Sequence, residues 1–199
     1  MKRFFGLQGC SKAWKIDELA RESEKLLIIC ADSKIQENLF EDLKFFAADK
    51  QIISFKGWES LPYEQLSPPI DISADRISSI FKLNENSWDI IITSVESLIQ
   101  KVLPYKLLEP ISFSINEQQL ISRESIIKKL NIGGYRRVSL VEEVGDYAVR
   151  GSVIDFFPSD VKSPVRIEFF DNEIERLRFF NPETQRTISS LDSLRILPV

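Results

Sequence analysis

The chain contains no histidine, and this absence excludes several kinds of chemistry. Without imidazole there is no histidine general base, no Ser–His or Cys–His nucleophile pair and no histidine-ligated metal. Cysteine is also scarce, because Cys10 and Cys30 are too few for a disulfide framework or a four-cysteine zinc site. We therefore expect no metal and no cofactor, and a reduced, cytoplasmic protein.

Long hydrophobic runs are missing as well. The basic and apolar residues 1–5 are interrupted by Gly6, and no run approaches the roughly 18 residues of a membrane span. The net charge is −4 and the pI is about 5.1, which argues against a broadly basic nucleic-acid footprint. We expect a soluble chain that uses neither a membrane nor a large basic face.

The two halves of the 199-residue chain show different hydrophobic patterns. Residues 1–110 alternate short apolar runs with amphipathic stretches, which predicts an α/β lobe in which helices cover a parallel sheet. The continuously apolar runs at residues 26–31 and 90–93 are typical of strands buried on both faces. Pro104 and Pro110 mark the change of character, so we place a domain boundary at residue 110.

Residues 111–199 indicate an α+β lobe on an antiparallel sheet. One helix is expected over residues 122–130, where Ser122 can cap its start and Gly133 ends it. Strand-like segments separated by Gly, Pro, Asp or Asn follow at residues 136–143, 147–157, 165–170 and 173–180. Nine of the twelve arginines lie in this half, and arginine is enriched in recognition surfaces.

Residues 6–13, GLQGCSKA, come close to the phosphate-binding pattern G-x-x-x-x-G-K-[ST]. Ser11 replaces the second glycine and Ala13 replaces the hydroxyl that would hold Mg²⁺, while Lys12 is kept. The only near match to the acidic residue that such a site also needs is Asp155, in the other half. We interpret the segment as a helix-opening turn and expect no ATP hydrolysis; weak nucleotide binding is the alternative. The vestigial phosphate-loop residues are Gly6, Ser11, Lys12 and Ala13.

The segment 165–170, VRIEFF, carries the candidate binding residues. Strand alternation sends Val165, Ile167 and Phe169 to the core and turns Arg166, Glu168 and Phe170 outward. An exposed aromatic beside an arginine is a common composition of protein–protein interfaces. The alternatives are that Arg166 and Glu168 form a solvated pair and that Phe170 tucks under the turn at residues 171–172. The facing of Arg150 stays ambiguous at this stage.

Two longer stretches carry a resemblance to a known family. One is GWESLPYEQLSP at residues 57–68, followed by Asp71 and Arg76. The other is GDYAVRGSVIDFFP at residues 145–158, continued by PVRIEFFDNEIERLR at residues 164–178 and TQR at residues 184–186. Together with the degenerate phosphate loop, they make residues 6–198 resemble the N-terminal, UvrB-like module of the bacterial transcription-repair coupling factors (Mfd).

The resemblance implies two domains and one binding partner. Residues 1–110 would be a RecA-like (P-loop-type) domain 1a, and residues 111–199 would be a UvrB-like domain 2 that binds the repair protein UvrA. The chain would then be a non-catalytic adaptor that recruits UvrA to stalled transcription complexes for nucleotide excision repair. The resemblance transfers UvrA contacts to Arg150, Arg166 and Phe170, and Glu168 shares their expected surface.

The resemblance also implies a much longer parent, of which this chain would be a fragment. That parent would be an ATP-dependent DNA translocase that contacts RNA polymerase through parts absent here, and its C-terminal domain would mask the UvrA surface. UvrB inserts a long aromatic hairpin after the position of Tyr63, whereas only residues 64–70 separate Tyr63 from Asp71 here. We therefore expect no direct DNA binding; the alternative is a UvrB-like DNA-binding or nucleotide-binding fragment of a translocase.

Overall fold

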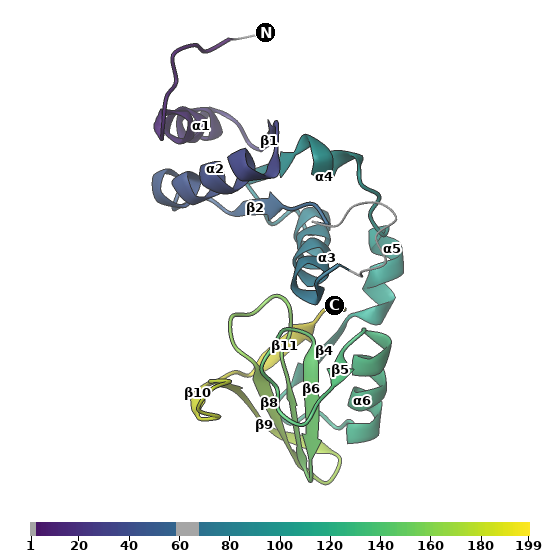
Figure 1. Cartoon of the computed structure of the whole chain (residues 1–199). Helices are drawn as coiled ribbons and strands as arrows, with labels where there is room; N and C mark the ends of the chain where they lie inside the picture. The colour runs from purple at the N-terminus through teal and green to yellow at the C-terminus, as the bar shows by residue number, and fades with distance from the viewer. Residues whose placement is uncertain (1–2, 59–67) are drawn as a thin grey trace. The chain divides into compact units, whose positions relative to one another are not determined.

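The computed structural model describes residues 3–58 and 68–199 (Figure 1). Its backbone divides the chain into two compact units, Met1–Leu66 with Ser79–Val102 and Ser67–Ser78 with Leu103–Val199. A mixed α/β fold with parallel and antiparallel sheets is confirmed, whereas the division into domains at residue 110 stays a prediction. The comparison of the Tyr63–Asp71 link with the UvrB hairpin falls mostly outside the described residues.

Helices and strands alternate along the first unit. In chain order its elements are α1 (Ser11–Glu22), β1 (Leu26–Cys30), α2 (Ser33–Phe46), β2 (Ile52–Phe55), the end of α3 (Ile70–Asn84), β3 (Ile90–Ser94) and α4 (Val95–Ile99). The three strands form a parallel sheet in the order β1-β3-β2. This is the helix-covered parallel arrangement that the alternating pattern predicts.

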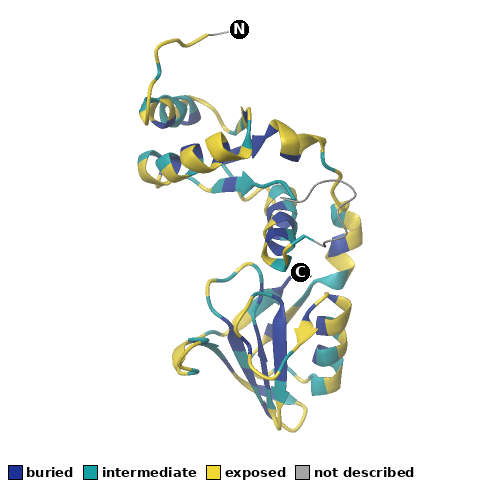
Figure 2. Ribbon diagram, in the orientation of Figure 1, coloured by how far each residue is buried: buried dark blue, intermediate teal, exposed yellow. Residues whose placement is uncertain are grey.

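Helices α1 and α2 pack on one face of this sheet. Ala13 of α1 and Leu43 of α2 are fully buried with Ile90 and Ile92 of the central strand β3, which is buried along its whole length. The expectation that residues 26–31 are buried on both faces is wrong, because only the face of the edge strand β1 that packs with α1 and α2 is covered (Figure 2). Its burial alternates, and Leu27 and Ile29 are 54% and 53% exposed.

The second unit is built around a six-stranded sheet with strand order β10-β9-β8-β7-β6-β5. Its pairs are antiparallel except for the parallel pair β5–β6, and a two-stranded antiparallel sheet β11-β4 lies beside them in the unit. After the start of α3, the elements are α5 (Tyr105–Leu108), η1 (Glu109–Ile111), β4 (Phe113–Asn116), α6 (Arg123–Ile132), β5 (Arg136–Arg137), β6 (Asp146–Arg150), β7 (Val153–Phe156), β8 (Val165–Phe170), β9 (Glu173–Phe180), β10 (Thr187–Ser190) and β11 (Ser193–Ile196).

Helix α6 covers one face of the six-stranded sheet. Its residues Ile126 and Leu130 are fully buried against a core that includes Phe156, Ile167 and Leu177. The predicted cap is confirmed, since the backbone N–H of Ser125 donates to the hydroxyl of Ser122 at 3.2 Å. On the opposite face of the sheet, Val141, Ala148 and Phe180 form a second, smaller buried cluster.

Two predicted strand boundaries are wrong. The segment 136–143 is a strand only at Arg136–Arg137, because the buried carboxylate of Asp146 holds the rest in a loop. That carboxylate accepts hydrogen bonds from the Arg136 guanidinium at 2.8 Å and from the backbone N–H of Glu143 at 3.2 Å. The segment 147–157 is two strands, β6 and β7, which turn at Gly151 with a φ of +59°.

Candidate functional site

The candidate binding residues lie on the face of the six-stranded sheet opposite α6, which we call the outer face. Along β8, Val165, Ile167 and Phe169 are buried in the core, so the residues between them point away from it. Phe170 is 70% exposed and does not tuck under the following turn. The predicted facing of Arg166, Glu168 and Phe170 is therefore confirmed, while their part in binding stays a prediction.

Arg166 is held by a two-pronged ion pair on this face. Its Nε and Nη2 atoms donate to the two carboxylate oxygens of Asp155 at 2.7 and 2.8 Å, and Nη2 also reaches the side-chain oxygen of Gln185 at 3.3 Å. Asp155 lies directly opposite Arg166 in the β7–β8 register and is only 3% exposed. The Arg166 guanidinium also lies 4.7 Å from the centre of the Phe180 ring.

This pairing fixes both the charge and the orientation of Arg166. The hydrogen bonds that Arg166 donates to Asp155 raise the pKa of the guanidinium, and partial burial lowers it by less. In this bidentate geometry Nη1 of Arg166 can still donate to a further acceptor, since it makes no hydrogen bond within residues 3–58 and 68–199. Arg166 is thus a preoriented donor whose charge is already balanced.

Glu168 pairs with a neighbour other than the one considered from sequence. Its carboxylate lies 3.2 Å from Nη1 of Arg178, across the β8–β9 pair. Both side chains of this pair are about a quarter exposed, so water weakens the attraction between them. The alternative of a solvated Arg166–Glu168 pair is therefore wrong: each of the two residues has its own cross-strand partner.

Arg150 joins the same face, which resolves its ambiguous orientation. Val149 packs against the core, so its neighbour Arg150 points outward, opposite Val153 in the β6–β7 register. The guanidinium of Arg150 donates to the backbone carbonyl of Ser139 at 2.6 Å. The sheet thus places all four predicted residues, from β6 and β8, on one surface.

Sequence reasoning missed the residues that hold Arg166. From the sequence, Asp155 is named as a near match to the acidic residue of a nucleotide site and within a stretch that carries the resemblance. Gln185 is named only within the string TQR, and Phe180 is not named. One signal was available, because a carboxylate within the apolar segment 153–156 needs a buried partner. Identifying that partner as Arg166 requires the β7–β8 register, which the sequence alone does not supply.

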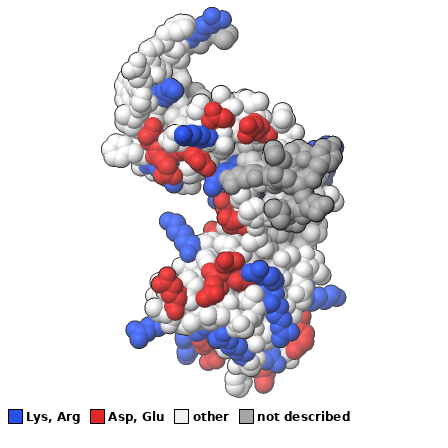
Figure 3. Space-filling view, viewed as in Figure 1, with Lys and Arg blue, Asp and Glu red and all other residues white. Residues whose placement is uncertain are grey.

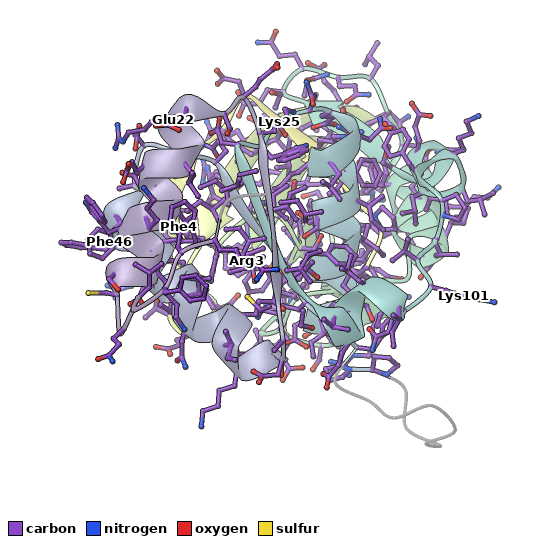
Figure 4. The ribbon with its side chains drawn as sticks, turned by 90° about the horizontal axis from the view of Figure 1, so that it is seen from above. Arg3, Phe4, Glu22, Lys25, Phe46 and Lys101 are labelled. Atoms are coloured by element: carbon purple, nitrogen blue, oxygen red, sulfur yellow. The ribbon has the colours of Figure 1, made fainter. Side chains whose placement is uncertain are left out.

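Residues 6–10, the start of the segment that comes close to the phosphate-binding pattern, form the turn that opens α1. Gly6 and Gly9 have φ angles of +75° and +54°, and the hydroxyl of Ser11 donates to the carbonyl of Gln8 at 2.6 Å. Ala13 is fully buried in the core, whereas Lys12 is exposed. Just before this segment, the ring centre of Phe4 lies 4.9 Å from the ammonium of Lys15. Phe4 is labelled in Figure 4. The hydroxyl of Ser11 is thus committed within the turn.

The remaining surface offers few other sites within the described residues. In residues 3–58 and 68–199, no group of three or more His, Cys, Asp or Glu side chains could hold a metal ion. None of the helices in that part of the chain is long and apolar enough to cross a membrane. On the face shown in Figure 3, basic and acidic side chains are intermingled, without a continuous basic stripe.

Comparisons with known proteins first define a class of domain. Residues 113–199 match the family model described as the UvrB interaction domain. The match begins at the first residue of β4 and includes every strand of the outer face. The candidate binding surface therefore lies wholly within the part of the chain that is similar to an interaction domain.

Individual relatives share a more particular description. The chain is 33% identical over 193 residues to the transcription-repair-coupling factor of Escherichia coli (strain K12), covering 96% of this chain and 17% of that protein. It is 31% identical over 187 residues to that of Haemophilus influenzae and 26% identical over 194 residues to that of Bacillus subtilis, covering 94% and 97% of this chain and 16% of each relative. The resemblance to these factors is thereby confirmed.

Proposed function

We propose that this chain is a non-catalytic adaptor module that binds UvrA through the outer face of its six-stranded sheet. In this role it recruits UvrA, and with it nucleotide excision repair, to stalled transcription complexes. The proposal is supported by the UvrB interaction domain match over residues 113–199 and by relatives named for coupling transcription to repair. The single observation that carries it is the 70% exposure of Phe170 on this arginine-rich face.

The outer face has the properties of a protein-binding surface. Phe170 offers a large apolar ring that gains free energy when a partner covers it. Arg166 is already oriented by Asp155, so less conformational freedom is lost when the partner binds. Arg166 and Glu168 each have a cross-strand partner of opposite charge. A protein that covers them therefore does not bury an unpaired charge.

The first unit fits a supporting role in this proposal. We assign residues 1–110 to a RecA-like domain 1a and residues 111–199 to domain 2. The parallel sheet supports the first assignment, and the buried methyl group of Ala13 supports a phosphate loop that has lost its metal-binding hydroxyl. ATP-driven translocation, contacts with RNA polymerase and masking by a C-terminal domain belong in this proposal to other parts of a longer parent.

The direct test is to mix the chain with purified UvrA and measure the affinity of wild type and Phe170→Ala. We expect the variant to bind at least about 30-fold more weakly, which corresponds to about 2 kcal/mol. Phe45→Ala is the matched control, because Phe45 is also a highly exposed phenylalanine but lies on α2 in the other unit. It should bind UvrA as wild type does.

Two results would contradict the proposal. One is the absence of a wild-type complex with UvrA, and the other is an unchanged affinity of a folded Phe170→Ala variant. The alternatives have their own signatures: a nucleotide-binding fragment would release heat on titration with Mg-ATP, and a DNA-binding fragment would retain duplex DNA in a salt-dependent way. We expect neither signal from this chain.

A further inference from the structure

Leu120 is 80% exposed although its backbone is firmly held in the second unit. It forms an antiparallel bridge with Glu173, the first residue of β9. On either side of it, the backbone N–H of Ile121 donates to the Asn172 carbonyl at 2.8 Å, and that of Ile174 donates to the Gln119 carbonyl at 3.0 Å. The segment around Leu120 is therefore an extra piece of sheet edge rather than a free loop.

The bridge determines which way Leu120 points. Ile121 packs against the core, so Leu120 points to the opposite side, which is the outer face. Glu173 lies directly opposite both Leu120 and Phe170, and residues paired across strands project from the same side of a sheet. Phe170, Glu173 and Leu120 thus form a row across the outer face, with a carboxylate between two exposed apolar side chains.

We infer that this row, which we call the tip patch (Leu120, Phe170 and Glu173), is one continuous contact surface for the partner of the outer face. The inference rests on the proposed function, since it extends the surface that contains Phe170. Neighbouring positions in the row are about 5 Å apart, so a partner that covers the Phe170 ring also reaches Leu120. Sequence reasoning could not link them, because 50 positions separate these two residues.

The charges around the tip patch indicate the chemistry of the partner. Asp171 and Glu175 lie exposed beside Glu173, and within the described residues these three carboxylates form no ion pair. One exposed cation, Arg176, follows Glu175, so these four residues together carry a net negative charge. A matching surface therefore has an apolar depression bordered by lysine or arginine side chains. This differs from the Arg166 end of the outer face, where the positive charge is balanced by Asp155.

The test compares Leu120→Ser with Ile132→Ser in the UvrA-binding measurement. Ile132 is a similarly exposed aliphatic residue at the end of α6, the helix on the opposite face of the sheet. We expect Leu120→Ser to weaken UvrA binding at least about 5-fold, because burial of a leucine side chain is lost. Ile132→Ser should leave the affinity unchanged, and thermal unfolding should show that both variants fold.

A charge reversal at Glu173 tests whether the partner surface is basic. Glu173→Lys should weaken binding to UvrA more at low salt than at high salt, because screening reduces the repulsion from a basic partner surface. Tighter binding of Glu173→Lys would overturn the assignment of a basic partner surface.

Unchanged affinity of folded Leu120→Ser, in a measurement where Phe170→Ala weakens binding, would overturn the extension of the contact surface to Leu120. The proposed function would be unaffected by that result. If wild type does not bind UvrA, the proposed function itself fails.

Discussion

The two units of this chain expose apolar side chains in different surroundings. In the first unit, Leu27 and Ile29 lie on an edge strand of a parallel sheet, within an apolar segment. In the second unit, Phe170 and Leu120 stand among charged side chains that have fixed cross-strand positions. Exposure alone therefore does not identify a binding site. Phe170 is distinguished by its ordered, charged surroundings within a region similar to an interaction domain.

The largest expected effect separates buried from exposed residues within the first sheet. Ile92→Ala removes a fully buried side chain from the central strand and should lower the free energy of unfolding by about 3 to 4 kcal/mol. Leu27→Ala, on the edge strand, should lower it by less than about 1 kcal/mol because water already reaches this side chain. Urea denaturation of the two variants measures the difference. Equal losses of unfolding free energy would contradict the exposure of the face of β1 that carries Leu27.

The next effect concerns the second sheet, where the Asp155–Arg166 pair is a structural element as well as a binding element. Arg166→Leu leaves the buried carboxylate of Asp155 without its partner and should lower the free energy of unfolding by about 2 to 3 kcal/mol. The matched control is Glu168→Gln, which breaks the more exposed pair with Arg178 and should lower it by less than about 1 kcal/mol. Urea denaturation again gives both values.

A double variant tells charge burial apart from lost packing. Asp155→Leu combined with Arg166→Leu removes both charges, so it should recover most of the stability that Arg166→Leu loses. Failure of this recovery would mean that the ion pair does not account for the loss. The result also affects binding studies, because Arg166 variants need a stability check before their affinity for UvrA is interpreted.

The smallest expected effect is a difference in reactivity between the two cysteines of the first unit. Burial raises the pKa of the Cys30 thiol, and the nearby carboxylate of Asp32 raises it further, so Cys30 forms less thiolate at a given pH. Cys10 is exposed. At mildly alkaline pH, iodoacetamide should therefore modify Cys10 at least about 10-fold faster than Cys30, as read by peptide mass spectrometry. Comparable rates would contradict the burial of the end of β1.

Part of this structure was predictable because the relevant signals are local. Alternation along residues 165–170 correctly placed Phe170 outward, and Ser122 was correctly identified as a helix cap. The continuous apolar run of β1, in contrast, suggested burial on both faces, whereas neighbouring elements cover only one face of this edge strand. The sequence states how apolar a strand is, but not which neighbours it has.

The candidate site was only half predictable for the same reason. Arg166, Glu168 and Phe170 could be placed on one face from their spacing in a single strand. The contact of Arg166 with Asp155 and the bridge between Leu120 and Glu173 depend on register between segments that are distant in sequence. Register follows from loop lengths and packing together, so such pairs become visible only in three dimensions.

Oxidative footprinting of the chain, alone and in complex with UvrA, tests the binding surface most directly, because it reports the solvent exposure of individual side chains. We expect UvrA to protect Phe170 from oxidation and to leave the equally accessible Phe45 of the other unit as reactive as before. Protection of Phe45 together with undiminished oxidation of Phe170 would contradict the assignment of the outer face as the UvrA-binding surface.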